Sequence, residues 1–133
     1  MTDQRAWTLT ADRLPDGQVA VAIAARGGRG RAGGSFPLGG GPAAIMGRGK
    51  HEPVVVACAG GPMERWVVTD RSGRSHPLEW VDAAGLPLGV AVLPARTRGV
   101  AVRRLGADGT PDFELRESPR LRWRAPVVPR PGG

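Results

Sequence analysis

Few residues of this chain have the types and spacing that catalysis or metal binding requires. The only histidines are His51 and His76, and no His-x-x-x-His or paired-cysteine spacing accompanies them for zinc. Cys58 and His76 would act as nucleophile and base only if the fold brought them together. Cys58 lies in the apolar run of residues 54–59, which indicates a buried small side chain instead. We therefore expect no catalytic residue and no metal site.

Two glycine patterns are similar to nucleotide-binding motifs. Residues 28–33 match the dinucleotide fingerprint GxGxxG, but residues 34–37 cannot begin the helix that would meet the pyrophosphate. Residues 47–50 match the end of a phosphate loop. However, Ala44 stands where that loop needs its first glycine, and no serine or threonine follows Lys50. We expect no bound cofactor.

A first group of candidate interaction residues lies in a glycine-rich segment. Arg26, Arg29 and Arg31 are interleaved with glycines, and Phe36 follows them. This pattern is similar to arginine–glycine segments that bind single-stranded nucleic acid by phosphate contact and guanidinium stacking. The alternative is a solvated loop with no partner.

A second group, formed by Arg120, Arg122 and Arg124, alternates with apolar residues. On a strand these arginines would share one face and present a ladder of cations to phosphate or to an acidic partner. The alternative is an edge strand whose charges discourage aggregation. The formal net charge of the chain is +7, which fits an anionic partner. It also fits the arginine-rich codon usage of a GC-rich genome.

Glycines and prolines recur so often after Leu14 that no helix of ordinary length fits between them. Three turn sequences, at residues 14–17, 70–73 and 107–110, predict hairpins. Eight or nine short strands are expected, over residues 5–11, 18–25, 53–59, 65–69, 75–81, 88–93, 100–105, 112–117 and 120–125. This pattern predicts an all-β fold, either a small antiparallel β-sandwich or a partly open barrel.

The length predicts a single β domain over residues 1–125. Within it, residues 27–49 are rich in glycine and few of their side chains could offset the entropy of ordering them. We therefore expect a long mobile loop there, which becomes ordered only against a partner. Residues 126–133, rich in proline and glycine, are expected to form an extended tail.

Residues 90–94, 100–102 and 108–109 show the succession of strand, proline-containing turn, strand and Asp-Gly turn. This succession resembles immunoglobulin-like domains of actinobacterial proteins over about residues 54–117. The resemblance implies a binding or structural scaffold and carries over no functional residue.

The first functional hypothesis is a non-enzymatic subunit of a larger assembly that works by contact with a protein partner or with further copies of itself. The alternative is a module for nucleic acid or another polyanion that uses the two arginine groups, and the second alternative is an enzyme without a recognisable motif. No apolar run is long enough to span a membrane. The chain starts without the apolar core of a signal peptide, and its one cysteine allows no internal disulfide. We therefore expect a cytoplasmic protein.

Overall fold

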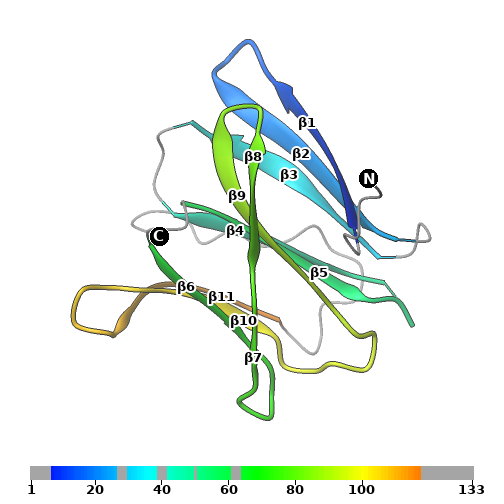
Figure 1. The fold of residues 1–133 in the computed structure, drawn as a ribbon, viewed down its shortest axis with the longest axis vertical. Helices are drawn as coiled ribbons and strands as arrows, with labels where there is room; N and C mark the ends of the chain where they lie inside the picture. Colours follow the sequence, from blue (N-terminus) through cyan, green and yellow to red (C-terminus); the bar gives the residue numbers. More distant parts are fainter. Residues whose placement is uncertain (1–6, 27–29, 39–41, 50, 61–63, 118–133) are drawn as a thin grey trace, which may run out of the picture.

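The described residues form three antiparallel β-sheets (Figure 1). The computed structural model describes residues 7–26, 30–38, 42–49, 51–60 and 64–117. The first sheet has the order β1-β2-β3, the second β4-β5-β9-β8 and the third β11-β10-β6-β7. The strands are β1 (Trp7–Arg13), β2 (Gln18–Ala25), β3 (Arg31–Pro37), β4 (Ala43–Arg48), β5 (Val54–Ala59), β6 (Arg65–Thr69), β7 (Ser75–His76), β8 (Glu79–Ala83), β9 (Leu86–Leu93), β10 (Ala101–Leu105) and β11 (Pro111–Arg116). The predicted all-β class is confirmed, and this part of the chain offers no helix that could cross a membrane.

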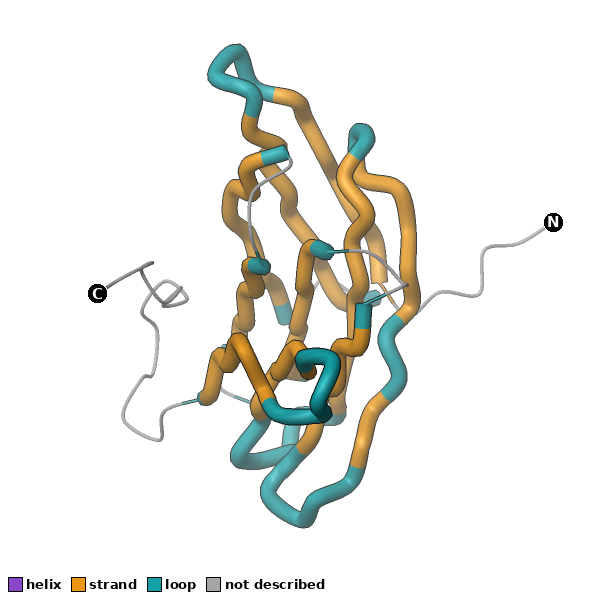
Figure 2. The backbone as a smooth tube through the Cα atoms, turned by 90° about the vertical axis from the view of Figure 1, so that its left-hand side faces the viewer, coloured by secondary structure: helices purple, strands orange, loops and turns teal. Residues whose placement is uncertain are grey.

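The second sheet is covered on both faces, so the fold has two apolar cores. In Figure 1 it lies between the first sheet at the top and the third at the bottom. Val55 and Ala57 of β5 belong to the core shared with the first sheet, whereas Val54, Val56 and Cys58 belong to the core shared with the third. Both faces of β5 are therefore buried, which explains its unbroken apolar sequence. Figure 2, turned by 90°, shows strands and loops alone in the described part of the chain.

All three predicted hairpin turns are present, and they share one construction. In the β1–β2 turn, the Gly17 amide donates to the Leu14 carbonyl over 3.0 Å, and the Leu14 amide donates to the Gln18 carbonyl over 2.7 Å. Gly17, Gly73 and Gly109 have φ angles of 86°, 86° and 85°. Glycine adopts this left-handed conformation without steric cost. The local sequence is thus sufficient to specify these turns.

The expectation that residues 27–49 form a long loop is wrong. This segment contains β3 and β4, and β3 pairs with β2 along its whole length. Its glycines permit close packing between neighbouring backbones. A Cβ on Gly47 would overlap the carbonyl oxygen of Arg31, and a Cβ on Gly34 would lie 3.1 Å from Cγ2 of Ile45. Residues 27–29 and 39–41 lie outside the described residues.

The expected strand over residues 75–81 is divided between two sheets. β7 pairs with β6 in the third sheet, and β8 pairs with β9 in the second. This division, together with β3 and β4, accounts for eleven strands among the described residues instead of the expected eight or nine. The expected strand over residues 120–125 and the tail over residues 126–133 lie outside the described residues.

Candidate anion-binding end

The residues with potential catalytic chemistry have structural partners or are buried. Cys58 is fully buried in β5, and its burial raises the pKa of its thiol. A thiol that stays protonated is a poor nucleophile. Nε2 of His76 lies 2.8 Å from Oδ2 of Asp70 in the β6–β7 hairpin, whereas His51 is exposed between β4 and β5. Within the described ranges, no group of three or more histidine, cysteine or acidic residues could hold a metal ion.

Of the interaction residues predicted from the sequence, Arg26 and Arg31 are described and exposed. Arg26 follows β2 and Arg31 begins β3. The expectation that Phe36 contacts a partner is wrong. Phe36 is 1% exposed, because alternation along β3 directs its side chain into the core between the first two sheets. The remaining candidates, Arg29, Arg120, Arg122 and Arg124, lie outside the described residues.

Four connections meet at one end of the three sheets. This end, which we call the basic end, comprises the described residues of the β2–β3, β4–β5, β6–β7 and β9–β10 connections, the adjoining strand ends and Glu117. The registers align its strand ends, since Val54 lies opposite both Arg48 and Leu93, and Thr69 lies opposite Ala101. Its arginines are Arg26, Arg31, Arg48, Arg71, Arg74, Arg96, Arg98 and Arg116, and its acidic residues are Glu52, Asp70 and Glu117.

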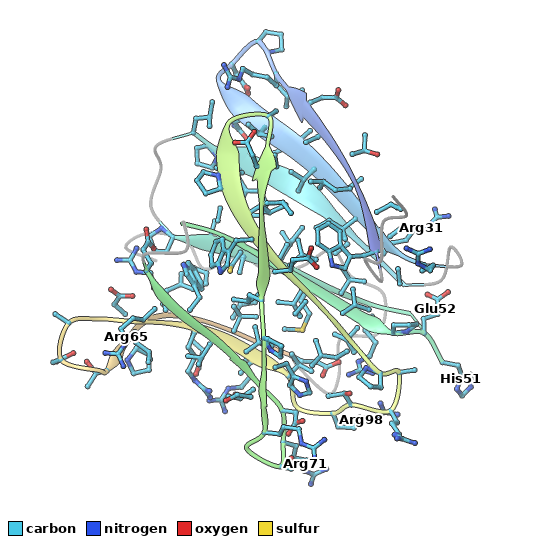
Figure 3. All side chains as sticks on the ribbon, viewed as in Figure 1. Arg31, His51, Glu52, Arg65, Arg71 and Arg98 are labelled. Atoms are coloured by element: carbon cyan, nitrogen blue, oxygen red, sulfur yellow. The ribbon has the colours of Figure 1, made fainter. Side chains whose placement is uncertain are left out.

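The opposite end of the sheets has the reverse balance of charge. Its described acidic residues are Asp12, Asp16, Glu64, Asp82, Asp108 and Asp112, and its described arginines are Arg13, Arg65 and Arg104. In Figure 3, Arg31, Arg98 and Arg71 lie along the right and lower right of the molecule, whereas Arg65 lies on the left. The described part of the chain is therefore polarised, with its surplus of positive charge at one end.

The β6–β7 turn and the β9–β10 connection touch at the basic end. The Arg71 amide donates to the Arg98 carbonyl over 2.8 Å. Gly99 has a φ of 66°, and a Cβ there would lie only 2.9 Å from Cβ of Arg71. Glycine thus permits this close approach. The side chains of Arg71, Arg74, Arg96 and Arg98 are exposed and form no ion pair with any described residue.

Arg48 holds the β9–β10 connection in place. Its guanidinium bonds both carboxylate oxygens of Glu117 through Nε and Nη2. Nη1 also donates to the Ala95 carbonyl over 2.8 Å, and Nη2 donates to the Thr97 carbonyl. The side chains of Arg48 and Glu117 are only 20% and 15% exposed. Arg48 is therefore neutralised by Glu117 and supports the loop that carries the exposed Arg96 and Arg98.

Asp70 fixes the shape of the β6–β7 turn. Its Oδ1 accepts hydrogen bonds from the Ser72 amide over 2.8 Å and from the Ser72 hydroxyl over 2.6 Å. Hydrogen bonds from Ser72 and His76 hold the pKa of Asp70 well below its usual range. The ionised carboxylate therefore keeps the turn closed while Arg71 and Arg74 remain exposed on it.

Sequence reasoning missed this arrangement, since Arg71 lies in a hairpin turn and Arg98 in a connection between two sheets. The signal that could have identified both loops is local. Each loop combines arginines with a glycine that requires a positive φ, Gly73 in one and Gly99 in the other. Which loops touch depends on the pairing of β6 with β10.

No protein-family model, curated protein or solved structure matches the chain. The resemblance to immunoglobulin-like domains therefore stays a prediction, and the function has to be argued from the geometry of the basic end.

Proposed function

We propose that this chain is a non-enzymatic binding domain that docks an anionic partner at its basic end, as a subunit of a larger assembly. The observation that supports this proposal is the set of four exposed arginines on two touching loops, Arg71, Arg74, Arg96 and Arg98, without ion pairs in the described structure. Cations concentrated at one end speed encounter with an anion and orient it on arrival.

The roles of Cys58 and His76 support a binding function over an enzymatic one. Cys58 packs in the core beneath the second sheet, and His76 bonds to the carboxylate that shapes a turn. Cys58 thus has a part in the core, and His76 has a part in shaping the turn that carries Arg71 and Arg74.

Two classes of partner could present an anionic surface to the basic end. A protein partner, or a second copy of the chain, would have to present clustered carboxylates. A nucleic acid presents a denser array of negative charge, which the net charge of +7 favours. The location we propose is the cytoplasm, since the single cysteine allows no internal disulfide.

Titration with polyanions tests the proposal. The full chain is titrated with poly-L-glutamate and with a nucleic acid duplex, alongside the variant R71Q/R98Q and the control R13Q/R65Q. The control removes the same charge from the opposite end. We expect salt-sensitive binding to at least one polymer, weakened by R71Q/R98Q far more than by R13Q/R65Q. Absence of binding to every polymer at low salt, or equal weakening by both variants, would contradict docking at the basic end.

Capture from the native source provides a complementary measurement. We expect the wild-type chain, and not R71Q/R98Q, to retain a partner that then elutes with it as one species in size exclusion with light scattering. A stable monomer that retains nothing would count against a subunit of an assembly.

A further inference from the structure

Arg98 shares its hydrogen-bond acceptors with Arg48. Nη1 of Arg98 lies 2.9 Å from the Ala95 carbonyl oxygen and 3.2 Å from the Thr97 carbonyl oxygen. Arg48 donates to the same two oxygens. Two guanidinium groups therefore converge on one loop. The Glu117 carboxylate forms its ion pair with Arg48 and not with Arg98, so the charge of Arg98 is uncompensated by any described carboxylate.

Arg98 and Arg71 retain donors that no described residue accepts. A guanidinium has five N–H donors in a planar fork, and both hydrogen bonds of the Arg98 side chain use Nη1. Its Nε and Nη2 are therefore available, as are the side-chain donors of Arg71. Because the Arg71 amide bonds the Arg98 carbonyl, the two backbones are fixed beside each other. Figure 3 shows both side chains at the lower margin of the molecule.

This geometry suits a phosphate group. A guanidinium fork bonds phosphate oxygens bidentately, and two forks from adjacent backbones can hold one phosphate or two successive phosphates. Arg74 and Arg96 continue the positive surface on the same two loops, and Arg31 extends it along the basic end. A partner that uses all of these cations must carry anions at short, regular intervals, as a nucleic acid backbone does.

Among the described residues of the basic end, the imidazole of His51 is the one exposed ring on which an unpaired base could stack. Trp7, at the same end, is 5% exposed and belongs to the core. Stacking supplies much of the affinity of single-strand binders. With several exposed arginines and one such ring, the contacts are mainly to phosphates, which favours a duplex and carries no sequence information.

We propose that Arg71 and Arg98 form a phosphate-binding pair through which the basic end docks, independently of base sequence, on the backbone of a nucleic acid duplex. This inference rests on the proposed function and names the partner of the same site. Arg48 is a positioning residue in this arrangement, because it holds the loop of Arg98 and uses four of its five donors within the fold.

Fluorescence anisotropy with the full chain tests the inference. The probes are two labelled duplexes of unrelated sequence, a labelled single strand, labelled poly-L-glutamate and anionic phospholipid vesicles. Inorganic phosphate is added as a competitor. We expect both duplexes to bind equally and more tightly than the single strand. Affinity should fall steeply between about 50 and about 200 mM salt. R71Q/R98Q should weaken duplex binding about tenfold and lower the salt dependence by about two counterions, with R13Q/R65Q within about twofold of wild type.

Tighter binding to poly-L-glutamate or vesicles than to duplex would overturn the phosphate-backbone inference while leaving docking of an anionic partner intact. Displacement of the duplex by millimolar phosphate would assign the pair to a free phosphate ion and overturn the duplex partner. Equal losses in R71Q/R98Q and R13Q/R65Q would overturn the Arg71–Arg98 site. Absence of binding to all probes would overturn the proposed function as well. Matched thermal unfolding of the two variants confirms that each comparison concerns folded protein.

Discussion

Arg48 and Glu117 form a bidentate ion pair between the last residue of β4 and the residue that follows β11. The pair joins the second sheet to the third across the edge of their shared core. The Glu117 amide also donates to the Val100 carbonyl over 2.8 Å. The position of the β9–β10 connection, with its exposed arginines, thus depends on the same contact that links two sheets.

We expect Arg48→Ala to lower the free energy of unfolding by about 2–4 kcal/mol, because it removes the ion-pair partner of the half-buried Glu117 and one of the two guanidinium donors to the Ala95 and Thr97 carbonyls. Urea unfolding monitored by tryptophan fluorescence measures the change. The matched control, Arg65→Ala, removes an exposed arginine and should stay within about 0.5 kcal/mol of wild type. If Arg48→Ala were as stable as the control, Arg48 would not be the support that its contacts indicate.

Gly47 is expected to be among the least replaceable residues of the chain. A Cβ at this position would overlap the Arg31 carbonyl oxygen, so Gly47→Ala must separate β3 from β4. We expect a loss of about 3 kcal/mol or more in the same unfolding experiment. Gly17→Asn is the control, since no atom lies near its Cβ position and asparagine tolerates a positive φ. A Gly47→Ala variant with wild-type stability would contradict the close packing of this segment.

Hydrogen exchange tests whether residues 31–37 are ordered in the wild-type protein, without a substitution. Because β3 pairs with β2 along its length, amides of residues 31–37 that bond to β2 should exchange almost as slowly as those of β2. Exchange at the rate of an unfolded peptide in the free protein would restore the mobile loop that the glycine content predicts.

The particular residues show why some features follow from the sequence and others do not. Gly17, Gly73 and Gly109 specify turns through local backbone preference, so all three hairpins were predictable. The glycines of β3 and β4 act through packing against distant backbone, which composition alone does not reveal. The contact of Arg71 with Arg98 likewise depends on the register of β6 with β10. The apolar run over residues 54–59 indicated burial, but not that its two faces belong to different cores.

The pH dependence of stability should have an acidic limb to which Asp70 contributes. Hydrogen bonds from Ser72 and His76 hold the pKa of Asp70 below its value in the unfolded chain, which is about 3.9. The resulting stabilisation is complete above that unfolded pKa and is lost as the pH falls below it, because the unfolded state then binds more protons. Urea unfolding from about pH 6 down to about pH 2 measures this limb. Asp70→Asn should flatten it, and an unchanged slope in that variant would contradict the role of Asp70.

Cys58 should lower the free energy of unfolding at alkaline pH. Burial raises the pKa of its thiol above the unfolded value of about 8.5, so the unfolded chain ionises first as the pH rises. Stability should therefore fall above about pH 8.5 in the wild type and less so in Cys58→Ala. A thiol reagent should label native protein only at the rate of unfolding, since Cys58 is fully buried. Rapid labelling of the native protein would contradict this burial.

The most direct test of docking at the basic end is an NMR titration of the full, isotope-labelled chain with an unlabelled nucleic acid duplex. We expect amide shifts to concentrate in residues 70–74 and 94–99, with smaller changes at Arg31 and Glu52. The turns at residues 14–17 and 106–110, at the opposite end, should stay unchanged. Shifts centred on those opposite turns, or no shift at low salt, would contradict docking at the basic end.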